Sequence, residues 1–177
     1  GSTRYISPGK AAEICAQVPA FVATVGLFVN EPLADVNRII GSLRLGLVQF
    51  HGDETPEYCD SVGHLYMKAL RATNRDQIEV EAQSFQTAQA ILVDTATDGQ
   101  FGGTGKTFDW RMLPDLAKPV VLAGGLDATN VGAAIAATHP YAVDVSGGVE
   151  RSRGVKDVAK MKKFVEAVQS ADRSNNE

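Results

Sequence analysis

The chain has 177 residues, of which 44% are hydrophobic and 21% are charged, as expected for a single globular domain with one sizeable core. Its net charge of −4 argues against a nucleic-acid partner, and no apolar run approaches the length of a membrane span. The two cysteines, Cys15 and Cys59, have neither metal-binding nor redox spacing. We therefore expect a cytoplasmic protein with no metal site, no nucleic-acid partner and no membrane partner.

Short apolar runs alternate with longer amphipathic stretches along the chain. The expected strands are 22–29, 45–50, 65–70, 90–94, 120–123 and 142–145. The expected helices are 11–18, 33–43, 56–62, 75–85, 128–137 and 156–168. Ser7-Pro8 and Thr55-Pro56 each combine a good N-cap with a proline suited to the first helical position. The alternation predicts one α/β domain over residues 1–177, with a parallel sheet covered by helices.

The number of strands leaves two architectures open. An eight-stranded TIM (β/α)8 barrel needs about 250 residues, so the chain is short by roughly two strand–helix units. A six-stranded open sheet is the alternative. A barrel with about six strands has two unpaired edges, at which we expect a second copy of the chain to pair.

Two apolar runs end in paired glycines. They read VVLAGGL at 120–126 and AVDVSGGVE at 142–150. Turns of this kind expose backbone N–H groups that can bind a phosphate, and the last two strands of a barrel carry the usual phosphate site of that fold. Tight turns alone could also require the glycines. The presence of two such turns favours phosphate binding, and so an enzyme that acts on a small phosphorylated metabolite.

The carboxyl ends of the expected strands also carry polar residues, namely Asn30, His51, Arg71, Asp94 and Asp144. Asp144 lies in an apolar strand, so it either lines a polar site or is a buried structural hydrogen-bonding group. Asp94 could be a general acid, or it could cap a turn. A histidine in a turn, such as His51, is more often structural than catalytic.

Other basic residues and glycines carry a weaker signal. Arg4 and Lys68 are single basic residues, which are usually solvated. The glycine-rich loop at 102–107 resembles a phosphate-binding loop without its full spacing, and could equally be a lid or a flexible connection.

Eight segments together resemble the phosphoribosylanthranilate isomerase family, whose fold is a (β/α)8 barrel. They are TRYISP at 3–8, VGLFVN at 25–30, VQFHGDE at 48–54, KALR at 68–71, VDT at 93–95, GGTGKTFDW at 102–110, LAGGL at 122–126 and AVDVSGGVE at 142–150. The resemblance covers nearly the whole chain in order and spacing. Other phosphate-binding barrels, such as sugar-phosphate epimerases and indole-glycerol-phosphate synthase, lack the GGTGKTFDW loop.

The resemblance implies an Amadori rearrangement of N-(5′-phosphoribosyl)anthranilate to 1-(o-carboxyphenylamino)-1-deoxyribulose 5-phosphate in tryptophan biosynthesis, without a cofactor. It makes Asp94 the general acid and pairs Arg4 with the anthranilate carboxylate, while His51 and Asp144 line the same pocket. The implied phosphate-binding residues are Gly103, Gly124, Gly125, Ser146, Gly147 and Gly148. We expect a monomer or a homodimer.

The chain departs from the family in one respect. The family's general base is a cysteine in a first strand that ends in Lys-Ile-Cys-Gly, and the 177 residues contain no such sequence. We therefore expect an N-terminally incomplete barrel. The alternative function is an inactive fragment or a non-catalytic barrel that binds a phosphorylated ligand.

Overall fold

The sheet consists of six parallel strands in sequence order. The computed structural model describes residues 4–72, 74–94, 110 and 113–174. The strands are β1 (Val25–Phe28), β2 (Leu47–Phe50), β3 (Tyr66–Arg71), β4 (Ala90–Asp94), β5 (Val120–Ala123) and β6 (Ala142–Val143). Each strand pairs with the next along the chain, so β1 and β6 are the outer strands of the described sheet. The alternation of the sequence correctly predicts this parallel order.

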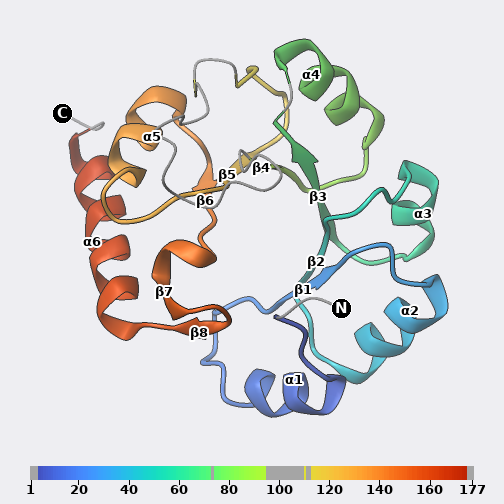
Figure 1. The fold of residues 1–177 in the computed structure, drawn as a ribbon. Coiled ribbons are helices and arrows are strands. Elements are labelled where there is room, and N and C mark those ends of the chain that lie inside the picture. Colours follow the sequence, from blue (N-terminus) through green and yellow to red (C-terminus); the bar gives the residue numbers. More distant parts are fainter. Residues whose placement is uncertain (1–3, 73, 95–109, 111–112, 175–177) are drawn as a thin grey trace.

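The helices lie around the outside of the strands (Figure 1). They are α1 (Pro8–Cys15), α2 (Leu33–Ser42), α3 (Pro56–Ser61), α4 (Arg75–Ser84), α5 (Val131–Thr138) and α6 (Val158–Ser174). Ser7 and Thr55 accept hydrogen bonds from backbone N–H groups of the helices they precede, which confirms both predicted caps. The first helix was expected over 11–18 but spans Pro8–Cys15, so both ends were wrong. The Ser7 cap starts the helix at Pro8, and Pro19 disfavours helical backbone at the residue before it.

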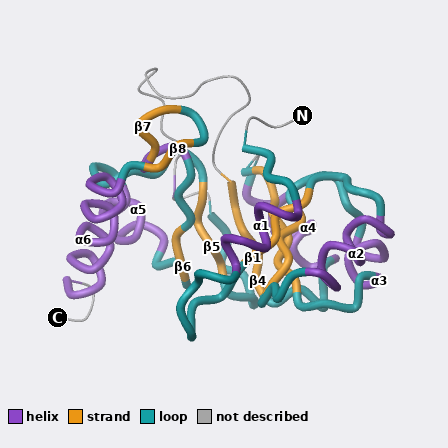
Figure 2. The backbone as a smooth tube through the Cα atoms, turned by 90° about the horizontal axis from the view of Figure 1, so that it is seen from below, coloured by secondary structure: helices purple, strands orange, loops and turns teal. Residues whose placement is uncertain are grey.

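A short hairpin between β6 and α6 was not expected. A 3₁₀ turn at Gly147–Val149 (η2) leads into β7 (Glu150–Ser152), which pairs antiparallel with β8 (Val155–Lys156). Gly154 makes the reversal with a φ of 82°, a conformation that glycine adopts without strain. The hairpin is polar, so it has no apolar alternation to mark it in the sequence. Figure 2 shows the hairpin and the N-terminal segment at the same end of the molecule.

The strands are buried on both faces in the middle of the sheet. The face toward the helices carries the larger core, in which Val48, Phe50, Ile91 and Val93 are fully buried. The opposite, inner face carries a smaller cluster of Met67, Ala69, Leu92 and Ala123. Since successive side chains of a strand alternate between faces, this division tells which residues at the strand ends point inward.

Candidate active site

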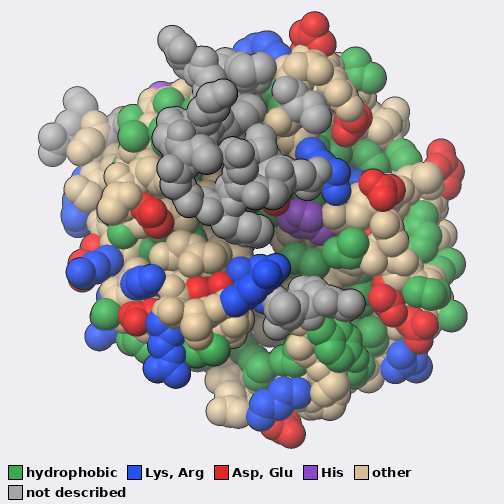
Figure 3. Space-filling view, in the orientation of Figure 1, with side chains coloured by type: hydrophobic (Ala, Val, Ile, Leu, Met, Phe, Trp, Pro, Cys, Tyr) green, Lys and Arg blue, Asp and Glu red, His purple; other side chains and the backbone are tan. Residues whose placement is uncertain are grey.

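His51 and Asp94 meet at the carboxyl ends of their strands. Asp94 is the last residue of β4 and lies two residues after inward-facing Leu92, so it is on the same face of the strand. His51 follows β2 directly. The Nε2 atom of His51 lies 3.2 Å from Oδ2 of Asp94. Both side chains are about one-quarter to one-third exposed, so solvent and ligands can reach them. In Figure 3, a histidine lies near the centre of the visible face with acidic and basic side chains around it.

Gln49 extends this contact into the barrel interior. Its amide nitrogen lies 2.8 Å from Nδ1 of His51, and the residue is only 6% exposed. The three residues therefore form a chain from the inner face of β2 to the end of β4. Gln49 was not among the sequence-predicted site residues, although a glutamine within the apolar run Leu47–Phe50 was a visible signal.

Asp144 shares the electrostatic environment of these residues. It follows β6, and its backbone N–H donates to the carbonyl of Leu122 on β5 at 2.8 Å. Crowding by protein atoms raises the pKa of Asp144 by desolvation, and the nearby charge of Asp94 raises it further. The charges of His51 and Lys156 act to lower that pKa. The side chain still reaches solvent, so Asp144 is not the fully buried structural group that was considered as an alternative.

The first glycine pair forms a tight loop after β5. Gly124 and Gly125 have φ values of 92° and 64°, which side-chain-bearing residues rarely adopt. Asn130 fixes this loop, because its amide donates to the carbonyl of Gly125 at 2.9 Å and its Oδ1 accepts from the N–H of Asp127 at 2.9 Å.

The second glycine pair packs directly on the first loop. A Cβ atom on Gly148 would lie 1.9 Å from the carbonyl oxygen of Leu126, so only glycine permits this approach. Lys156 donates to the carbonyl of Ser146 at 2.8 Å and brings a positive charge to the loop. Five of the six predicted phosphate-binding residues thus lie on two touching loops, and Gly103 lies outside the described residues.

Arg4 is an exposed residue, as expected for a single basic residue, but it also forms an ion pair. Its Nε and Nη2 atoms donate to the two carboxylate oxygens of Glu150, both at 2.8 Å. The pKa of Glu150 is lowered to about 2, and the hydrogen bonds from Arg4 are the largest cause. Lys156 lowers this pKa further, while desolvation acts to raise it. The Nη2 atom also lies 3.9 Å from the position of a Cβ on Gly147, which places the guanidinium beside the second glycine loop.

Lys68 is buried rather than solvated. Only 4% of its side chain is exposed, and Nζ lies 3.0 Å from Oε2 of Glu54. Nζ also donates to the carbonyl of Gly52 at 2.5 Å, while Glu54 accepts from the N–H groups of Asn30 and Gly52. The pair therefore joins the residues that follow β1 and β2. A lysine inside a strand with apolar neighbours on both sides was the signal that sequence reasoning passed over.

The family model for N-(5′-phosphoribosyl)anthranilate isomerase matches residues 1–167. The chain belongs to this family. Isomerases from Pseudomonas putida and Pseudomonas syringae are each 49% identical to it, over 171 and 168 residues. The two matches cover 96% and 94% of this chain, and 83% and 82% of the respective relatives. The family resemblance inferred from the eight segments is therefore confirmed.

Solved structures of isomerases in the family have the same architecture. The enzyme from Thermotoga maritima superimposes with a TM-score of 0.85 at 37% identity, covering 96% of this chain and 83% of that one. A family structure in complex with reduced 1-(o-carboxyphenylamino)-1-deoxyribulose 5-phosphate has a TM-score of 0.80 at 34% identity, over 96% of this chain and 82% of that one. The fold is the TIM barrel, with six of its strands in the described residues, and the open-sheet alternative was wrong.

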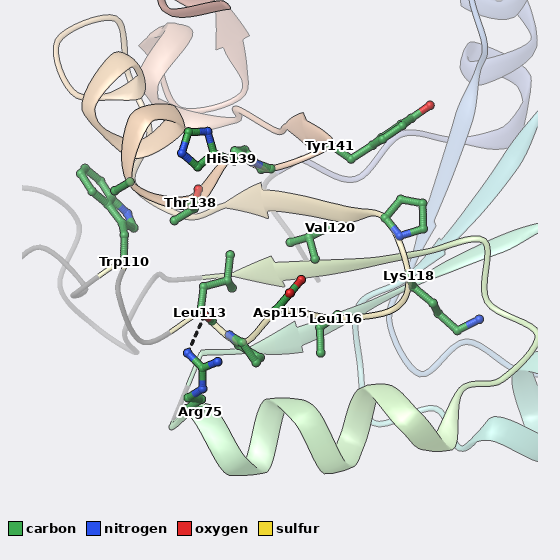
Figure 4. Close-up of a pocket in the computed structure, with 14 residues that line it drawn as sticks. Arg75, Trp110, Leu113, Asp115, Leu116, Lys118, Val120, Thr138, His139 and Tyr141 are labelled. Atoms are coloured by element: carbon green, nitrogen blue, oxygen red, sulfur yellow. Dashed lines mark hydrogen bonds between the residues drawn. The ribbon is translucent and has the colours of Figure 1, made fainter. Parts of the chain in front are cut away.

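A groove of about 600 Å³ lies elsewhere in the molecule, between α4, β5 and α5 (Figure 4). Its lining includes Trp110, Leu113, Leu116 and Tyr141, and Arg75 donates to the carbonyl of Leu113 at 3.2 Å. None of the described residues predicted for the site lines this groove, so we do not assign the substrate to it.

Within the described residues, no group of three or more histidine, cysteine, aspartate or glutamate side chains could hold a metal ion. Burial raises the pKa of the Cys59 thiol to about 12, so this cysteine is an apolar core residue at neutral pH, and it belongs to the same core cluster as Val36 and Phe50. No helix in the described part of the chain is long and apolar enough to cross a membrane.

Proposed function

We propose that the chain acts on N-(5′-phosphoribosyl)anthranilate and catalyses its Amadori rearrangement to 1-(o-carboxyphenylamino)-1-deoxyribulose 5-phosphate, as an isomerase of tryptophan biosynthesis. Family membership supports this reaction, and the observation that carries the site is the contact of His51 with Asp94 at the carboxyl end of β4. In barrels of this kind the chemistry takes place at that end. The similarity to isomerases over 96% of the chain favours this reading over a non-catalytic barrel.

Asp94 is the proposed general acid. A proton passes from its carboxyl group to the furanose ring oxygen, the bond from that oxygen to C1 breaks, and the anilino nitrogen lone pair forms the C=N bond of a Schiff base. Removal of the C2 proton then gives the enolamine, which tautomerises to the ketone. The resemblance assigns that removal to a cysteine of a Lys-Ile-Cys-Gly strand, a sequence not found among these 177 residues. The roles proposed for this chain therefore concern binding and the acid step.

Substrate binding is proposed at two places around Asp94. Arg4 pairs with the anthranilate carboxylate, and a planar guanidinium with five N–H donors can contact Glu150 and a substrate carboxylate together. The phosphate is bound by backbone N–H groups of the two glycine loops, with the Lys156 charge nearby. His51 and Asp144 line the space between these ends.

We propose a cytoplasmic protein that needs no cofactor and exists as a monomer or a homodimer. One solved relative is described as monomers generated from a dimeric phosphoribosylanthranilate isomerase of Thermotoga maritima, which supports either state. Size-exclusion chromatography with light scattering distinguishes the two.

The acid role is tested by Asp94→Asn. We expect turnover to fall by a factor of about 10²–10⁴ or more, because the amide has no acidic proton to give. Binding of the reduced product analogue, measured by calorimetry, should change little. Asp115→Asn is the matched control, since Asp115 is exposed and lines the separate groove.

Near-normal turnover in Asp94→Asn would remove Asp94 from the acid role. Tight analogue binding by the unmodified chain without any turnover would instead favour a barrel that only binds phosphorylated ligands.

A further inference from the structure

Gln49 places a polar amide on the inner face of the barrel. It is the third residue of β2, and it aligns with inward-facing Met67 on β3. The residue is 6% exposed. Burial of an amide among apolar neighbours costs free energy unless the amide is hydrogen-bonded. The partner is Nδ1 of His51, at 2.8 Å from the Gln49 amide nitrogen.

The direction of that hydrogen bond determines where the imidazole carries its proton. An amide nitrogen only donates, so Nδ1 must accept and carries no hydrogen. A neutral imidazole then has its single N–H at Nε2. This is the atom that lies 3.2 Å from Oδ2 of Asp94, so His51 donates to that oxygen.

We propose that Gln49 is a positioning residue, which fixes the Nε2–H tautomer of His51 so that His51 donates to Asp94. The role rests on the proposed function, in which Asp94 is the general acid. Gln49 itself does not touch the substrate and acts through His51.

The hydrogen bond from His51 affects the acid step through the charge that develops on Asp94. When Asp94 gives its proton to the ring oxygen, its carboxyl group becomes an anion. The hydrogen bond from Nε2–H then becomes charge-assisted, and such bonds are roughly twice as strong as neutral ones. His51 therefore stabilises the product of the proton transfer, and it also orients the carboxyl group. In the other tautomer a bare Nε2 would face the carboxylate as a second acceptor and would oppose the transfer.

The first experiment measures the tautomer directly. Long-range ¹H–¹⁵N correlation spectra of the ¹⁵N-histidine-labelled protein distinguish Nδ1–H from Nε2–H imidazoles. Loss of one ring in His51→Asn assigns the signal among His51, His64 and His139. We expect Nε2–H in the unmodified chain, a mixture in Gln49→Leu, and Nδ1 protonated in Gln49→Glu, where the new carboxylate can only accept.

The second experiment measures the effect on catalysis. In Gln49→Leu we expect kcat to fall about tenfold, the size of one lost hydrogen bond, while KM changes much less. In the His51→Asn background the same substitution should change kcat less than twofold, because the group it acts through is absent. Gln89→Leu is the matched control at an exposed glutamine just before β4, and it should leave the tautomer and kcat unchanged.

Two kinds of result, spectroscopic and kinetic, contradict the proposed role of Gln49. An Nδ1–H tautomer in the unmodified chain, or the same tautomer in Gln49→Leu as in the unmodified chain, overturns the proposal. So does an unchanged kcat in Gln49→Leu when the unmodified chain turns over. A chain with no turnover contradicts the proposed function instead, and the spectra still decide the role of Gln49.

Discussion

At the scale of single residues, the ends of β1 and β2 depend on a buried ion pair. Burial acts to raise the pKa of Glu54, but hydrogen bonds from the Asn30 N–H and from Lys68 outweigh it, and the pKa is lowered. Glu54 is therefore a carboxylate at neutral pH, with both oxygens engaged. Such a pair adds little net stability compared with an apolar pair of similar shape, yet removing one partner leaves an uncompensated charge.

Lys68→Met tests this argument. We expect it to lower the free energy of unfolding by about 3–5 kcal/mol, since Glu54 then stays buried without its cation. Urea unfolding followed by circular dichroism gives the value. The double variant Lys68→Met/Glu54→Gln should recover part of the loss, because the amide is uncharged and its oxygen can still accept from a backbone N–H group. Lys162→Met on the exposed face of α6 is the control, with an expected change within about 0.5 kcal/mol. An equally small change for Lys68→Met would contradict a structural role for the pair.

At the scale of elements, the two glycine loops form one unit. The loop after β5 and the loop after β6 touch where Gly148 approaches the carbonyl of Leu126. A methyl group there requires the two backbones to separate. The separation would move the N–H groups of both loops relative to one another, and these are the groups proposed to bind the phosphate.

Gly148→Ala should therefore weaken binding of the reduced product analogue at least tenfold, which corresponds to about 1.4 kcal/mol. Calorimetric titration measures this, with thermal unfolding recorded on the same sample. Gly132→Ala is the control, because no atom lies within 4 Å of its Cβ position in α5 and alanine is the better helix former. Unchanged analogue affinity in Gly148→Ala would separate loop packing from phosphate binding.

At the scale of the whole molecule, Arg4 and Glu150 join two segments of the chain that are 146 residues apart in sequence. Arg4 lies in the segment that precedes α1 and β1 in the chain, and Glu150 begins the hairpin after β6. Their ion pair thus connects the two outer strands of the described sheet through their flanking segments. Val25 and Leu27 of β1 are 45% and 57% exposed, so side-chain packing does little at this edge.

The contribution of this pair should depend on pH. The folded-state pKa of Glu150 is about 2, below its ordinary value of 4.5, so its stabilisation is complete above about pH 4.5 and is lost as the pH falls toward 2. The difference in urea midpoint between the unmodified chain and Glu150→Gln should be constant above pH 4.5 and shrink below it. A difference that stays constant down to pH 2 would show that Arg4 does not bind the ionised carboxylate.

Local signals in the sequence determined the order of elements, the two capped helix starts and the glycine loops. Apolar periodicity, caps and positive φ each act over a few residues, so one chain segment is enough to reveal them. The family motifs further predicted Asp94, His51 and Arg4 as site residues. The contacts of Arg4 with Glu150, of Lys68 with Glu54 and of Gln49 with His51 were decided only by the tertiary structure. A charged or amide side chain is solvated or paired according to the partners that the fold places beside it. These partners come from distant segments of the chain or from the same face of a strand, and the surrounding packing decides how much water remains.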